Sequence, residues 1–187
     1  MSGNEQKYIQ EAFDTNWVVP LGPNVDGFEA DLQSFIAEDR QVVALSSGTA
    51  AVHLALIACG VQPGDEVCVQ SFTFCASSNP IKYIGASPIF IDSEEDTWNM
   101  DPDLLEKAIL DRIAKTGKKP KAIIPVALYG MPYDCERIMA VAEKYDIPVI
   151  EDAAEGFGSK FKGQVLGTFG KFGVLSFNGN KMITTSG

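Results

Sequence analysis

Residues 42–59 read VVALSSGTAAVHLALIAC, and this stretch decides the fold class. Val42–Leu45 is apolar and predicts a strand, and the small residues Ser46–Thr49 predict a turn. Ala50–Cys59 then places apolar residues at spacings of three and four, which is typical of a helix. The polar turn and His53 interrupt the apolar run, so the stretch does not read as a membrane span.

The same alternation of strand and helix continues outward from this stretch. Further apolar strand-like runs are Glu66–Val69, Pro88–Ile91, Ala122–Val126, Pro148–Ile150 and Val174–Phe177. Helical patterns cover Glu5–Asp14, Ala76–Ile84, Pro102–Ala114 and Cys135–Tyr145. Strands that alternate with helices favour a largely parallel sheet covered on both faces. We therefore expect an α/β fold, with an N-terminal helix and arm over residues 1–25 and one large domain over residues 26–187.

Composition narrows the class of protein. Of 187 residues, 45% are hydrophobic and 10% aromatic, which is enough for a folded core. Lys and Arg number 15 against 25 Asp and Glu, a net charge of −10 that disfavours nucleic acid as a partner. Residues 1–7 lack the basic flank and apolar core of a signal peptide. These features predict a cytoplasmic protein without a membrane segment.

Cysteine and histidine usage argues against a metal site. None of the four cysteines forms a C-x-x-C pair, and the chain has one histidine. We expect reduced thiols packed among apolar residues at Cys59, Cys68, Cys75 and Cys135. His53 is expected to pack in the core, and Asp101 before Pro102 predicts a capped helix start rather than half of a D-x-D metal motif.

Four polar features follow predicted strands, and each has a structural alternative. The turn before Ala50 offers helix N–H groups to a phosphate, although serine and threonine are also ordinary helix caps. Phe74 can stack on a flat ligand or fill the core. Glu151 and Asp152 end an apolar strand, and one of them would need a cation if buried, although the pair can also point outward at the start of a loop. Lys181, between a polar turn and apolar residues, can be an activated amine or a solvated side chain.

The order of these features resembles the DegT-type sugar aminotransferases, which have the aspartate aminotransferase fold. The motifs that carry the resemblance are GTAAVHLAL at 48–56, GDEV at 64–67, EDAAE at 151–155 and SFNGNK at 176–181. The resemblance to this family extends from about Trp17 to Gly187. Residues 92–94 and 97–100 look closest to members that act in exopolysaccharide and N-acetylbacillosamine pathways. The implied fold is a three-layer α/β/α large domain with a mostly parallel mixed sheet.

The resemblance also implies a cofactor, pyridoxal 5'-phosphate (PLP), and a role for each matching residue. Lys181 would form the Schiff base with PLP, Asp152 would pair with the pyridine nitrogen, and Phe74 would stack on the ring. Glu155 stands beside the ring, where many relatives have Gln or His. Ala127 departs from the His or Asn common at its position. The phosphate would be held by Gly48, Thr49, Ala50 and Ser176.

The implied reaction is transamination of a UDP-linked 4-keto-6-deoxy-N-acetylhexosamine with L-glutamate as donor and 2-oxoglutarate as product. Relatives are homodimers with a further, smaller C-terminal domain, so this chain resembles the N-terminal cofactor-binding half and as a fragment can be inactive. A sugar dehydratase of the same family is a second possibility, although those enzymes typically have histidine in place of Lys181. A non-catalytic PLP-fold binding or regulatory protein is a third, and an α/β domain with a coincidental lysine is the last.

Overall fold

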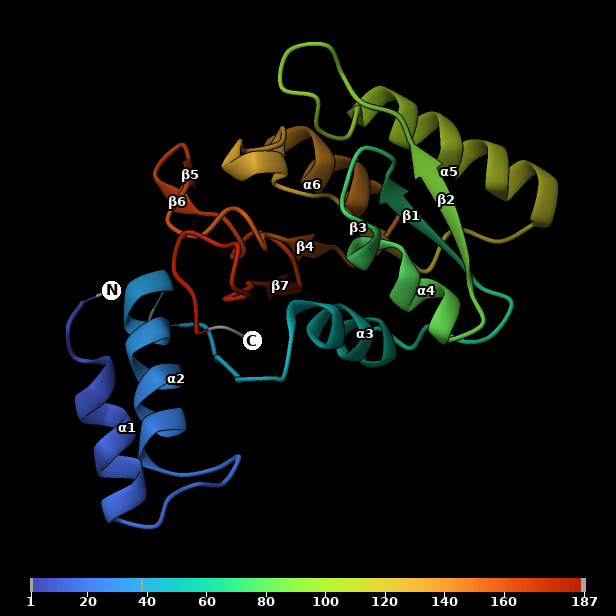
Figure 1. The fold of residues 1–187 in the computed structure, drawn as a ribbon. Helices are drawn as coiled ribbons and strands as arrows, with labels where there is room; N and C mark the ends of the chain where they lie inside the picture. Colours follow the sequence, from blue (N-terminus) through green and yellow to red (C-terminus); the bar gives the residue numbers. More distant parts are fainter. Residues whose placement is uncertain (1, 38, 186–187) are drawn as a thin grey trace. The chain divides into compact units, whose positions relative to one another are not determined.

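The computed structural model describes residues 2–37 and 39–185. The chain forms two compact units, Met1–Ala44 and Leu45–Gly187 (Figure 1). The boundary expected after residue 25 falls inside helix α2 (Pro23–Ile36), so the structural division lies later in the chain. No helix within the described ranges is both long and apolar enough to cross a membrane.

The described residues of the first unit form two helices. Helix α1 (Glu5–Asp14) has the predicted bounds, whereas α2 was not predicted because its turn formers, Pro23 and Gly27, resemble a loop. Proline is nevertheless compatible with the first turn of a helix. Gly22, just before α2, has φ +127°, and a Cβ there would lie 2.7 Å from Cε3 of Trp17. Only glycine fits this turn.

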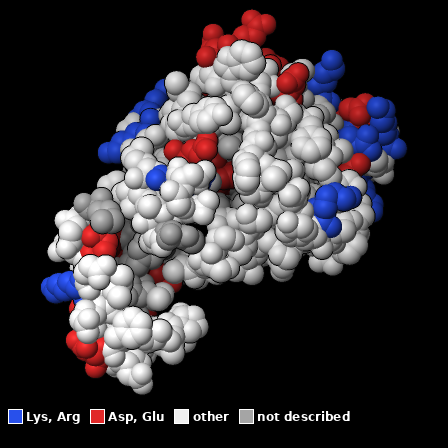
Figure 2. Space-filling view, viewed as in Figure 1, with Lys and Arg blue, Asp and Glu red and all other residues white. Residues whose placement is uncertain are grey.

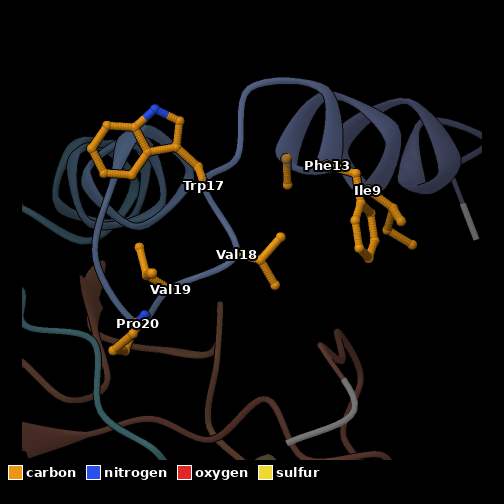
Figure 3. Close-up of a pocket in the computed structure, with 7 residues that line it drawn as sticks. Ile9, Phe13, Trp17, Val18, Val19 and Pro20 are labelled. Atoms are coloured by element: carbon orange, nitrogen blue, oxygen red, sulfur yellow. The ribbon is translucent and has the colours of Figure 1, made fainter.

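An apolar pocket lies on the face of α1 and the segment after it. Its lining residues are Ile9, Ala12, Phe13, Trp17, Val18, Val19 and Pro20 (Figure 3). None of the described residues of α1 is buried, and Leu32 is the one buried residue of α2. Burial within this unit therefore contributes little to the stability of either helix.

A parallel sheet forms the centre of the second unit. Its strands are β1 (Glu66–Gln70), β2 (Ser87–Ile91), β3 (Ala122–Ile124), β4 (Ile150–Asp152) and β7 (Phe172–Val174). The hydrogen-bonded order is β2-β1-β3 and β4-β7, and single parallel bridges from Ile123 to Val149 and from Val126 to Asp152 join the two groups. A short antiparallel hairpin, β5 (Lys160–Phe161) and β6 (Gln164–Val165), stands outside the sheet.

Helices cover both faces of this sheet, which gives the expected three layers (Figure 1). The α-helices of this unit are α3 (Gly48–Ala58), the five-residue α4 (Asn79–Tyr83), α5 (Pro102–Thr116) and α6 (Cys135–Lys144). Neighbouring residues of β1 point to different cores: Cys68 packs in one cluster with residues of α5 and α6, and Val67 and Val69 pack in the other with residues of α3 and α4. This alternation is what a strand between two helical layers requires.

Three elements differ from the sequence prediction in their existence or bounds. Residues 42–45 form no strand with any described residue, because a strand exists only through a hydrogen-bonded neighbour. The run Val174–Phe177 is replaced by β7 at Phe172–Val174, whose register is set by pairing with β4. The predicted helix over 76–84 divides into a 3₁₀ turn, η1 (Cys75–Ser77), and α4.

The predictions for the cap at Asp101, the four cysteines and His53 were confirmed in part. Asp101 caps α5, since its Oδ1 accepts from Asp103 N at 2.7 Å and Leu104 N at 3.1 Å. All four cysteines are free, but Cys75 is exposed rather than packed, because it opens η1 at the surface. His53 is half-buried, edge-on to Tyr83 with ring centroids 5.7 Å apart. The described residues contain no group of three or more His, Cys, Asp or Glu side chains able to hold a metal ion.

Candidate active site

The candidate site forms where the parallel strands β1 and β4 end. The segment after β1 contains Phe74, and β4 ends at Asp152. Parallel strands bring their carboxyl ends to one edge of a sheet, which is where α/β proteins bind ligands. Figure 2 shows acidic atoms recessed in a hollow on the face of the second unit, with a basic group beside it.

Asp152 is the buried acid of the site. Its Oδ2 accepts from the Ser77 hydroxyl at 2.5 Å, and its Oδ1 accepts from the Ala154 N–H at 3.2 Å. Burial raises the pKa of Asp152, while these two hydrogen bonds and the positive charge of Lys181 act in the opposite direction. The carboxylate is therefore placed where it favours a positively charged partner.

Lys181 and Glu155 form an ion pair beside this acid. Lys181 Nζ lies 3.6 Å from Glu155 Oε1, and their side chains are 16% and 33% exposed. The other oxygen of Glu155 accepts from the Tyr129 N–H at 2.7 Å. Tyr129 has φ +51°, a conformation that non-glycine residues rarely adopt. Glu155 thus connects the strained backbone at Tyr129 to the amine of Lys181.

The start of α3 packs closely against Ser176. Ser47 caps the helix, accepting from Ala50 N at 3.1 Å through its Oγ. A Cβ placed on Gly48 would lie 3.3 Å from Ser176 Cβ and 3.6 Å from its Oγ. The first N–H groups of a helix have no intrahelical acceptor and carry the positive end of its dipole. Gly48 and Thr49 at the start of the helix, together with the Ser176 hydroxyl, therefore form a small cradle suited to an anion, whereas the Ala50 N–H already donates to Ser47.

Phe74 offers an exposed aromatic face. Its side chain is 75% exposed, so it does not fill the core. Ser77 N donates to Phe74 O at 3.1 Å, which ties the backbone of Phe74 to the turn whose Ser77 binds Asp152.

Ala127 is buried, and its Cβ lies 3.0 Å from where a Cβ of Gly156 would be, so it packs inside the protein.

Ser77 was missed in the sequence, and the separate role of Glu151 was not recognised there. Ser77 lies in an unremarkable Ala-Ser-Ser stretch, and nothing there signals its bond to Asp152. Glu151 was grouped with Asp152, but it points to the other side of β4 and accepts from three backbone N–H groups, those of Gly167, Phe169 and Gly170. The period-two alternation of a strand could have separated these two acids.

The parallel sheet between two helical layers, with a lysine and two acids at its carboxyl edge, is the arrangement of an aminotransferase-type α/β protein. Comparison with known proteins gives the same class. The chain belongs to the DegT/DnrJ/EryC1/StrS aminotransferase family, whose sequence pattern matches residues 1–187. It is 54% identical over 187 residues to EpsN of Bacillus subtilis (strain 168), which its name describes as a pyridoxal phosphate-dependent aminotransferase; the match covers 100% of this chain and 48% of EpsN.

Two further relatives support the same assignment. GDP-perosamine synthase of Escherichia coli O157:H7 is 44% identical over 99% of this chain and 49% of its own length. The X-ray structure of an aminotransferase from Psychrobacter cryohalolentis superposes with a TM-score of 0.89 at 34% identity, covering 100% of this chain and 46% of that one. The chain thus spans about half the length of the relatives it matches.

The residues present fit PLP, the cofactor that this family membership implies. The buried Asp152 suits a protonated ring nitrogen, and Lys181 supplies an amine beside it. A Cβ on Gly48 would crowd Ser176 at 3.3 Å, so glycine leaves the most room for a phosphate to approach the backbone there. The exposed ring of Phe74 is free to stack on a flat heterocycle.

Proposed function

We propose that this chain is the cofactor-binding part of a PLP-dependent aminotransferase that aminates a nucleotide-linked keto sugar. The observation that carries the proposal is the convergence of Lys181, Glu155 and the buried Asp152 at one sheet edge. These residues come from two separate segments of the chain, one that contains Asp152 and Glu155 and one that contains Lys181. A coincidental lysine in a turn would not need to meet two acids, one of them buried.

Each residue would have a distinct task. Lys181 would bond to the aldehyde carbon of PLP through Nζ, and Asp152 would keep the ring nitrogen protonated. When bound, PLP supplies an electron sink for the carbon that bears the amino group. Lys181, released from the cofactor by the incoming amine, would then hold and move a proton at Nζ. Gly48, Thr49, Ala50 and Ser176 would bind the phosphate, Phe74 would stack on the ring, and Glu155 would orient the Lys181 amine.

For the substrate, we propose a UDP-linked 4-keto-6-deoxy-N-acetylhexosamine, with L-glutamate as the donor that becomes 2-oxoglutarate. The name of GDP-perosamine synthase supports a nucleotide-linked sugar as the substrate class. We also propose that the complete enzyme is a cytoplasmic homodimer that acts in polysaccharide biosynthesis. Amination rates of UDP- and GDP-linked keto sugars, measured on a chain extended to the length of its relatives, would test the choice of nucleotide.

Covalent capture of PLP tests the central assignment. The purified chain is incubated with PLP, reduced with borohydride and mapped by peptide mass spectrometry. The expected label is on Lys181, and it should disappear in Lys181→Ala but persist in Lys162→Ala, which changes an exposed lysine. Labelling that is spread over surface lysines and unchanged by Lys181→Ala would overturn the assignment.

A second measurement separates catalysis from binding alone. Added L-glutamate should bleach the absorbance of lysine-bound PLP in the extended chain, because an aminotransferase passes the amino group to its cofactor. A binding or regulatory protein would retain that absorbance. The presence of Lys181 favours transamination over dehydration.

A further inference from the structure

We propose that Ser77 is a positioning residue that acts through Asp152: its hydroxyl orients the carboxylate and, with Thr73, ties it to the turn that holds Phe74. Ser77 is not among the residues that the sequence motifs assign to the site. Its role toward the cofactor rests on the proposed function, but its contacts within the chain do not.

The hydrogen bonds have a fixed direction. Ser77 is 1% exposed, and its Oγ lies 2.5 Å from Asp152 Oδ2 and 2.8 Å from Thr73 Oγ1. A hydroxyl has one proton, and a carboxylate can only accept. Ser77 therefore donates to Asp152, and Thr73 donates to Ser77. The result is a chain of two hydroxyls that ends on the buried acid.

The same turn joins this chain to the exposed aromatic ring. Thr73 is the residue before Phe74, and Ser77 N donates to Phe74 O at 3.1 Å. Backbone and side-chain bonds thus fix Phe74 and the Asp152 carboxylate relative to each other, although they are 78 residues apart in the sequence. A ligand stacked on the ring would meet the acid in one defined orientation.

Electrostatics gives the hydroxyl a second effect. The charged groups that act on Asp152 are Lys181, which lowers its pKa, and Glu155, which raises it. Burial raises the pKa of Asp152, and the bonds from Ser77 and the Ala154 N–H oppose this rise. Loss of the Ser77 hydroxyl would therefore favour the protonated carboxyl, which cannot stabilise a protonated ring nitrogen.

The test follows the titration of Asp152 without any cofactor. The chain is labelled with [¹³Cγ]aspartate, the Asp152 signal is assigned with Asp152→Asn, and its shift is followed by NMR from pH 3 to 10. Ser77→Ala should increase the proton affinity of Asp152 about tenfold, the effect of losing one hydrogen bond to a charged group. Thr73→Val should shift it less in the same direction. Ser78→Ala, whose hydroxyl donates to Cys75 O at the surface, is the matched control and should titrate as wild type.

The results that would overturn the role of Ser77 differ from those that would overturn the proposed function. Superimposable Asp152 titrations in wild type and Ser77→Ala overturn the inference, and if Ser77→Ala does not fold, Thr73→Val gives the decision. With PLP added, both variants should bind it several-fold more weakly yet still be labelled at Lys181 by borohydride. A shifted titration in a chain that never labels at Lys181 would leave the contact standing while the proposed function fell.

Discussion

Replacing Glu151 with glutamine tests how the chain holds β7 beside β4. Glu151 is fully buried; its Oε1 accepts from Phe169 N at 2.5 Å and Gly170 N at 2.6 Å, and its Oε2 from Gly167 N at 3.0 Å. In the β4–β7 ladder it is paired with Gly173. Glutamine keeps the volume and one acceptor oxygen, but it turns an NH₂ donor toward the Gly167 N–H.

The cost follows from these three bonds. One buried N–H loses its acceptor, which costs about 1–3 kcal/mol, and the two remaining bonds lose their charged acceptor. The sum is a loss of about 2–4 kcal/mol in the free energy of unfolding. At about 2–4 °C per kcal/mol for a chain of this size, Tm should fall by about 4–16 °C.

Thermal and urea unfolding, followed by circular dichroism, measure this loss. Glu136→Gln is the matched control, because Glu136 pairs with Lys162 at the surface with both side chains more than 60% exposed. Its effect should stay within about 0.5 kcal/mol. A Glu151→Gln variant with the wild-type midpoint would refute the anchoring role of this carboxylate.

Three other substitutions test neighbouring features. Burial raises the pKa of Asp152, so the folded chain holds this proton more tightly than the unfolded chain does; the resulting stability is present below the unfolded value of 3.8 and is lost as pH rises through the raised pKa. Asp152→Asn should therefore gain stability relative to wild type as the pH rises above about 4, and parallel Tm profiles would contradict this. Gly48→Ala should weaken PLP binding about tenfold in a fluorescence titration, because its Cβ would crowd Ser176 at 3.3 Å; an unchanged Kd would argue against a phosphate at that position. In Gly173→Ala a Cβ would lie 2.0 Å from Gly167 O, so the variant should lose the native β4–β7 pairing and cooperative unfolding, and a wild-type transition would show that the strand register is wrong.

Regular elements with strong periodicity were predictable. Helix α1 matches its prediction at both ends, α5 and α6 start where expected, and β1 differs from its predicted run by one residue. Elements that exist only through pairing or packing with another segment of the chain were not predictable. The run 42–45 has the composition of a strand but no ladder partner among the described residues, and α2 begins with proline and contains glycine, so its sequence resembles a loop.

The sequence by itself determined the alternating α/β pattern and the chemical inventory of the candidate site. An acid at the end of an apolar run, a glycine at a helix start and a lysine in a polar turn are local signals, because each follows from a few neighbouring residues. Only the tertiary structure decided which groups meet. The bond between Ser77 and Asp152 joins residues 75 apart, and Glu151 faces away from Asp152 into the loop before β7. Such contacts depend on the packing of whole strands and turns, so no short stretch of the chain encodes them.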